Sequence, residues 1–177
     1  ILHKLVEMAD ALVINVRPGV ETRLGVDEAT LRKINPRLVT CYITGFGADG
    51  PYAKRAAYDN VGQALSGFLS RFHEGRDPRV AGPAVSDAAT GIFAAIGILG
   101  ALLERSRTGV GRKVEVSMIE ATLALAIEPL AHMFATGADQ PFHLRGAMSQ
   151  AYILTCKDGH RIALQMSSLA KFWEGLA

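Results

Sequence analysis

The chain has 177 residues, of which 49% are hydrophobic and 20% are charged. This balance excludes a disordered chain, collagen and a long coiled coil, and it is typical of about one globular domain. Lysine and arginine together number 19 and acidic residues 17, so the net charge is +2. Because these charges nearly cancel, we expect neither nucleic acid nor a membrane surface as a general partner.

The two cysteines, Cys41 and Cys156, are far apart and match no metal-ligand or redox spacing. Two distant thiols do not form a disulfide framework, so we expect a reducing, cytoplasmic location. The most apolar run, Gly91 to Leu103, is too short to span a bilayer and predicts a buried helix whose Leu, Ile and Ala stripe is core. The chain opens and closes inside helical patterns and lacks an initiator Met, so we expect a fragment of a longer enzyme.

A strand, a helix and a second strand are predicted near the start of the chain. A helix over Leu2 to Ala9 leads into a short apolar run from Ala11 to Val16, which is typical of a strand buried on both faces. A helix over Asp27 to Ile34 and a second buried strand over Leu38 to Thr44 follow. This order predicts a βαβ unit with a parallel sheet.

The rest of the chain continues the pattern and then changes character. In chain order we expect a helix over Tyr58 to Leu69, a loop over Phe72 to Pro83, a long helix over Ala88 to Arg105, a strand over Arg112 to Val116 and a helix over Met118 to Phe134. A linker over Gly137 to Gln150 precedes two β-rich runs, Tyr152 to Cys156 and Arg161 to Met166, joined by the hairpin signal Asp158-Gly159. This hairpin predicts a change of domain near residue 145.

Asp87 is the first candidate for chemistry, because it stands at the start of the longest predicted helix. Considered alone, an Asp there more often caps the helix. The functional alternative is a carboxylate nucleophile at the positive end of a helix, with free backbone N–H groups alongside that could stabilise charge on an acyl oxygen.

Two basic segments could bind phosphate. Asn15-Val16-Arg17-Pro18-Gly19 leaves the carboxyl end of a predicted parallel strand, where open α/β sheets bind ligands, and Arg23 follows it. Lys54-Arg55 precedes Tyr58-Asp59, a combination that suits a nucleotide diphosphate and its base. For each segment taken alone, an ordinary solvated loop is the more common interpretation.

Two other patterns carry little weight. The spacing of Gly45, Gly47 and Gly50 matches a dinucleotide fingerprint, but Pro51 follows and no helix is predicted to open there. The histidines show no metal-ligand spacing, so we expect no metal site.

Taken in order, the motifs resemble the class III CoA-transferase family, of the CaiB/BaiF type. The resemblance covers nearly the whole chain, and its ordered set is more specific than any single motif. It is carried by the segments Leu12 to Gly19, Gly45 to Tyr52, Tyr58-Asp59, Gln63 to Gly67, Asp87 to Gly91, Ala95 to Arg105, Thr108 to Gly111 and Val114 to Met118.

The resemblance implies a CoA-transferase that moves CoA between an acyl-CoA and a small carboxylic acid. The family's catalytic aspartate matches Asp87, which would form a mixed anhydride and then an aspartyl-CoA thioester. CoA is then a substrate and no permanently bound cofactor is expected. The positions matching the family's CoA contacts are Asn15, Val16, Arg17, Arg23, Ala56, Ala57, Tyr58 and Asp59, with Arg55 as a plausible phosphate contact.

The same resemblance implies two interlocked ring-shaped subunits, each with a Rossmann-like large domain and a small α+β domain. Residues 1–140 would then be part of the large domain, and residues 141–177 the linker and the beginning of the small one. The related α-methylacyl-CoA racemases carry a histidine where this chain has Tyr58, which makes racemase the second choice. A noncatalytic acyl-CoA-binding subunit is the third.

Overall fold

The computed structural model describes residues 1–72, 82–141, 143–167 and 170–176 of the chain. The chain forms two compact units, Ile1–Ile127 and Glu128–Ala177, and each is described by itself. Most of the loop expected over Phe72 to Pro83 lies outside the described residues.

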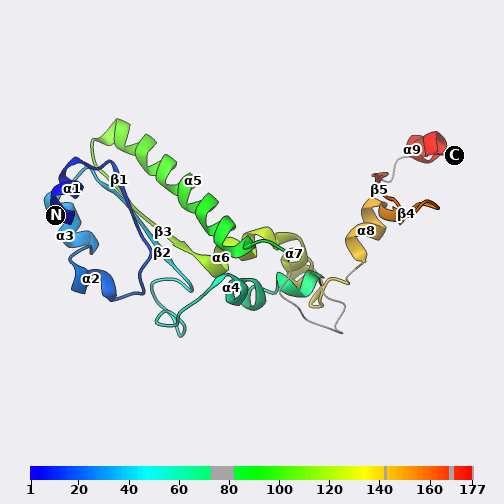
Figure 1. Ribbon diagram of the computed structural model, residues 1–177, viewed down its shortest axis with the longest axis horizontal. Coiled ribbons are helices and arrows are strands. Elements are labelled where there is room, and N and C mark those ends of the chain that lie inside the picture. The colour runs from blue at the N-terminus through cyan, green and yellow to red at the C-terminus, as the bar shows by residue number, and fades with distance from the viewer. Residues whose placement is uncertain (73–81, 142, 168–169, 177) are drawn as a thin grey trace. The chain divides into compact units, whose positions relative to one another are not determined.

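The first unit is a parallel α/β layer structure, as the sequence predicts (Figure 1). Its three strands run in the order β1-β2-β3, with Ala11 of β1 opposite Val39 of β2 and Thr44 of β2 opposite Ser117 of β3. Its elements are α1 (Leu2–Met8), β1 (Ala11–Ile14), α2 (Val20–Leu24), α3 (Glu28–Ile34), β2 (Val39–Thr44), α4 (Asp59–Leu65), the 3₁₀ helix η1 (Leu69–Phe72), α5 (Val85–Thr108), β3 (Lys113–Ser117) and α6 (Met118–Leu125).

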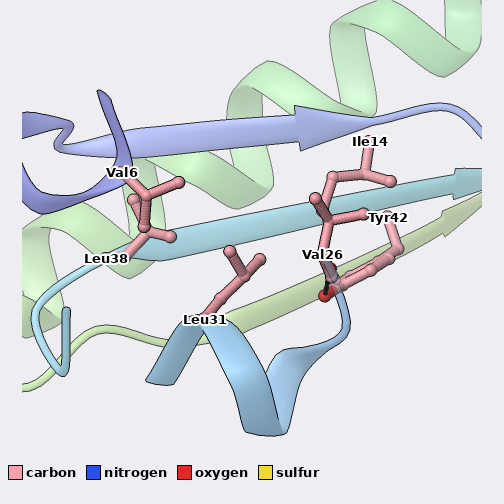
Figure 2. Packing of buried hydrophobic residues seen from close by; sticks show 6 residues of the cluster. All are labelled: Val6, Ile14, Val26, Leu31, Leu38 and Tyr42. Carbon is pink, nitrogen blue, oxygen red and sulfur yellow. Dashed lines mark hydrogen bonds between the residues drawn. The ribbon is translucent and has the colours of Figure 1, made fainter. Parts of the chain in front are cut away.

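A hydrophobic core fills the space between one face of the sheet and the helices α1 and α3. Figure 2 shows its six buried side chains, with the Tyr42 hydroxyl donating a hydrogen bond to the Val26 carbonyl oxygen at 2.8 Å. The helix α3 begins where the Asp27 carboxylate accepts a hydrogen bond from the Thr30 N–H, and hydrogen bonds from Thr30 lower the pKa of Asp27. The members of the core are Val6, Ile14, Val26, Leu31, Leu38 and Tyr42.

The long helix α5 packs on β2 and β3 from the other side of the sheet (Figure 1). Its small residues, including Ala94 and Ala101, are buried there. The expectation that the Leu, Ile and Ala stripe from Ile92 to Leu103 is core holds for these alanines and was wrong for the large side chains, because Ile92, Ile96, Leu99 and Leu103 are 58–66% exposed. Small side chains let the helix approach the sheet closely, so the large ones point away from it.

The helix α5 is also longer than predicted, with 24 residues. Of the helices in the described part of the chain, α5 alone has the length and hydropathy to cross a membrane, and α6 with α7 passes the same test if counted as one span. The length of its apolar run therefore does not exclude a membrane span, contrary to the expectation from the sequence. A long helix that packs on a sheet can meet the same criteria. The helix α5 packs on β2 and β3, and 28% of its most apolar window is buried.

The single helix expected over Met118 to Phe134 is two helices that part at Ala126. Pro129 explains the break, because a proline lacks the N–H that continues a helix and its ring clashes with the carbonyl group four residues earlier, here that of Leu125.

The second unit contains the predicted antiparallel hairpin. Strand β4 pairs with β5 so that Ala151 lies opposite Gln165, and the Cys156 N–H donates to the His160 carbonyl oxygen at the turn. A helix inside the expected linker was not predicted. The elements are α7 (Ile127–Thr136), which starts at the boundary, α8 (Leu144–Ser149), β4 (Ala151–Thr155), β5 (Arg161–Gln165) and α9 (Ala170–Leu176).

Candidate active site

A cavity of about 690 Å³ opens at the carboxyl end of the parallel sheet. Ligands in open α/β sheets bind at this end, because the loops that leave the strands meet there. Its lining comes from five separate parts of the first unit: residues 15–18 after β1, residues 43–45 at the end of β2, residues 55–58 before α4, the start of α5 and the start of α6. Strand ends and helix starts thus converge on one hollow.

Asp87 lies in the first turn of α5, is exposed and lines this cavity. It is the one carboxylate among the described lining residues. Gly91, one turn further along α5, lines the cavity as well and leaves the helix surface beside Asp87 without a side chain. A ligand in the cavity can therefore approach the Asp87 carboxylate along α5.

Asp59, and not a cap residue of α5 itself, accepts the hydrogen bonds of the first backbone N–H groups of this helix. The N-cap residue is Ala84, whose side chain offers no acceptor. Instead, Oδ1 of Asp59 accepts hydrogen bonds from the backbone N–H groups of Ser86 (2.8 Å) and Asp87 (3.2 Å). The expectation that free N–H groups stand beside Asp87 for an acyl oxygen is wrong for these two, because Asp59 already occupies them.

Buried hydroxyl groups hold the same turn from below. The Oγ atoms of Ser86 and Thr122 lie 2.8 Å apart, which joins α5 to α6, and the Thr90 hydroxyl donates to the Ser86 carbonyl oxygen at 2.6 Å. Ser86 and Thr122 are fully buried. Since buried polar groups are costly unless they are hydrogen-bonded, this network fixes the backbone that carries Asp87.

The positive charge of the cavity comes from Arg17 and Arg55. The Arg55 guanidinium lies over the Tyr52 ring at 4.1 Å from its centroid, and Tyr52 packs edge to face against Phe46. A cation held over a ring keeps its charge and its outer N–H donors available. The contact of Tyr52 with Arg55 was not predicted from the sequence, because no spacing rule indicates it.

A neighbouring cavity of about 330 Å³ shares Val16, Pro18 and Thr44 with the first one but has the opposite charge. Its lining includes six carboxylates and one lysine, namely Glu21, Asp27, Glu28, Asp49, Glu115, Glu120 and Lys113. Such a lining repels a polyanion such as CoA. Of the two cavities, the one lined by Arg17, Arg55 and Asp87 is therefore the one whose charge is compatible with a bound polyanion.

The structure brings most of the predicted site residues together. Asp87 shares the cavity with seven positions expected to contact CoA: Asn15, Val16, Arg17, Arg55, Ala56, Ala57 and Tyr58. Arg23 is exposed on α2 and does not line the cavity, and neither does Asp59. Their expected contacts with CoA remain predictions.

Other reactive groups lie elsewhere. Cys41 is fully buried in β2, as expected, and burial raises the pKa of its thiol. In the part of the chain that the structure describes, no group of three or more His, Cys, Asp or Glu side chains is arranged to hold a metal ion. No helix starts directly after Gly50, since α4 begins at Asp59, so the glycine spacing lacks the context of a dinucleotide fingerprint.

The chain is similar to several curated CoA-transferases. An acetyl-CoA:oxalate CoA-transferase from Acetobacter aceti is 38% identical over 90% of this chain and 44% of the relative. A formyl-CoA:oxalate CoA-transferase from Streptomyces avermitilis is 43% identical over 71% of this chain and 31% of the relative. A succinate–glutarate CoA-transferase from Agrobacterium fabrum is 37% identical over 71% of this chain and 32% of the relative. The chain thus spans less than half the length of these relatives.

Solved structures show the same fold. The crystal structure of a CaiB/BaiF family protein from Brucella suis matches with a TM-score of 0.80 and 31% identity, over 89% of this chain and 43% of the other. The crystal structure of a hypothetical protein from Mycobacterium tuberculosis matches with a TM-score of 0.78 and 28% identity, over 99% of this chain and 46% of the other. The family model for CoA-transferase family III matches residues 1–177, and the chain therefore belongs to that family.

Proposed function

We propose that the whole protein transfers CoA from an acyl-CoA to a small carboxylic acid and that Asp87 is its nucleophile. The observation that carries this proposal is the position of Asp87: an exposed carboxylate, alone of its kind among the described lining residues, in a cavity that also holds Arg17 and Arg55. A carboxylate can attack a thioester carbonyl carbon, and two guanidinium groups suit the phosphates of CoA.

The reaction then proceeds in two symmetric halves. An Asp87 oxygen attacks the acyl carbon, the C–S bond breaks, and the CoA thiolate leaves from a mixed anhydride. The thiolate attacks the Asp87 carbonyl carbon, releases the donor acid and leaves an aspartyl-CoA thioester. The acceptor carboxylate displaces the thiolate to form a second anhydride, and the thiolate attacks the acceptor carbonyl to give the new acyl-CoA and free Asp87.

The names of the relatives suggest which acids to test. The relatives are named for oxalate, succinate and glutarate, which are small dicarboxylic acids. We propose the same class of acceptor for this protein. We further propose a cytoplasmic enzyme that forms an interlocked homodimer, with residues 1–140 in the Rossmann-like large domain and residues 141–177 leading into the small one.

The decisive experiment compares the whole protein with its Asp87→Asn variant in CoA exchange against a panel of carboxylic acids. We expect transfer to be lost while CoA binding persists, and hydroxylamine to release CoA from the wild type alone. Unchanged transfer in the variant would remove Asp87 as the nucleophile. Deuterium entering the α-carbon of a 2-methylacyl-CoA without an acceptor acid would favour the racemase alternative, and binding without either reaction would favour the noncatalytic one.

A further inference from the structure

Gln63 is a buried polar side chain that the proposed mechanism does not use. It lies in α4 and is 2% exposed. Its amide nitrogen donates a hydrogen bond to Oδ2 of Asp59 at 2.6 Å and lies 3.5 Å from the Pro83 carbonyl oxygen. Because burying an amide is costly unless it is hydrogen-bonded, this contact defines where the side chain rests.

The two oxygens of the Asp59 carboxylate have separate partners. Oδ2 is bound by Gln63 from the same helix, and Oδ1 accepts from the N–H groups of Ser86 and Asp87, the latter 28 residues further along the chain. Residues four apart in a helix project from the same face, so Gln63 can grip Asp59 without distorting α4. A carboxylate fixed at one oxygen cannot rotate the other away from its partners.

We infer that Gln63 is a positioning residue for Asp87, acting through Asp59. Gln63 fixes the Asp59 carboxylate, Asp59 fixes the first turn of α5, and that turn carries the Asp87 side chain to the cavity. The inference rests on the proposed role of Asp87 as nucleophile. Displacing a reacting group by about 1 Å can cost about 100-fold in rate, so a small displacement of the first turn of α5 would lower the rate of the reaction.

The kinetic test uses the whole protein and the variant Gln63→Met, which keeps the length of the side chain and removes its donor. We expect kcat to fall about 10- to 100-fold, with KM for the acyl-CoA within about twofold, since Gln63 does not line the cavity. Asp59→Ala should cause at least the same loss. The double variant should be no slower than Asp59→Ala, because coupled residues are not additive.

A conservative change supplies the rescue. In Asp59→Asn the side-chain oxygen still accepts from Ser86 and Asp87, and the Gln63 amide can turn to accept from the new NH₂ group. We expect this variant to keep most of its activity with Gln63 present and to lose it with Gln63→Met. The control is Arg105→Met at the other end of α5, where Arg105 binds Asp10 and the Arg37 carbonyl oxygen. It should lower stability and leave kcat unchanged.

Hydrogen exchange tests the positioning without reference to turnover. In peptides covering residues 84–90, measured by mass spectrometry, Gln63→Met and Asp59→Ala should both speed exchange, and Arg105→Met should not. If no acyl-CoA is turned over by the wild type, the proposed function fails while this readout still decides whether Gln63 holds the turn. Unchanged exchange in Gln63→Met, or additive losses of kcat in the double variant, would overturn the inference.

Discussion

Gly45 and Ala57 lie so close together that a Cβ atom added to Gly45 would be 2.4 Å from the Cβ of Ala57. Both residues line the cavity, Gly45 at the end of β2 and Ala57 in the segment before α4. The carbonyl oxygen of Gly45 also accepts a hydrogen bond from the Ile119 N–H at the start of α6. The absence of one side chain therefore sets the distance between two walls of the cavity.

Replacing Gly45 by alanine should push the segment around Ala57 out of place. Overpacking of this kind costs about 1–3 kcal/mol, and about 1.4 kcal/mol corresponds to a tenfold loss of affinity. We expect CoA binding, measured by calorimetry, to weaken about tenfold. The double variant Gly45→Ala, Ala57→Gly restores the space and should recover most of the affinity. A Gly45→Ala variant with wild-type affinity would show that this contact does not shape the CoA site.

Part of this site could be predicted from the sequence, because strand ends and collinear motifs placed Asp87, Arg17 and Tyr58 in one region. The hydrogen bonds that hold the first turn of α5 could not be predicted from the sequence. A sequence reading looks for a cap next to the helix, where Ser86 and Asp87 are natural candidates. The actual acceptor is Asp59, 27 residues before Ser86, and only the tertiary packing of α4 against α5 brings it there.

The two arginines of the cavity should contribute through the phosphates of CoA. Hydrogen bonds to charged groups are worth about 1.5–3 kcal/mol, so Arg17→Gln and Arg55→Gln should each raise KM for an acyl-CoA about tenfold. An acyl-pantetheine donor lacks the diphosphate, and its KM should change little in either variant. Steady-state kinetics with both donors makes the comparison, with Lys4→Gln on α1 as the control. Equal losses for the two donors would contradict a phosphate contact.

Substitutions at two glycines of α5 allow the effect on helix stability to be measured apart from the effect on access to Asp87. Neither Gly91 nor Gly100 has a neighbouring atom within 4 Å of an added Cβ, so alanine fits at both positions. Each change should stabilise the helix by about 0.5–1 kcal/mol and raise the unfolding midpoint by about 2 °C. Only Gly91 lines the cavity, so Gly91→Ala alone should lower kcat/KM. If Gly100→Ala lowered it equally, the effect would not arise from blocked access.

The fold shows a similar division between local and tertiary causes. The strand β1, the helix α3 and the hairpin of β4 and β5 follow from local patterns of apolar residues and turns, and all three were predicted. The apolar stripe of α5 could not be assigned in this way, because hydropathy does not say which side of a helix meets a sheet. In this chain the small residues Ala94 and Ala101 meet it, and Leu99 remains exposed.

The contribution of Tyr42 to the free energy of unfolding should depend on pH in the alkaline range. Burial first, and then the charge of Glu28, raise the pKa of its hydroxyl, which donates to the Val26 carbonyl oxygen. Tyr42→Phe leaves that buried oxygen without this donor and should cost about 1–3 kcal/mol of unfolding free energy at neutral pH. A raised pKa in the folded state means that the contribution of the hydroxyl is complete below the unfolded value of about 10 and is lost as pH rises above it. The stability difference between wild type and variant, measured by urea unfolding, should therefore shrink from about pH 10 upward, and a constant difference up to pH 11 would contradict this account.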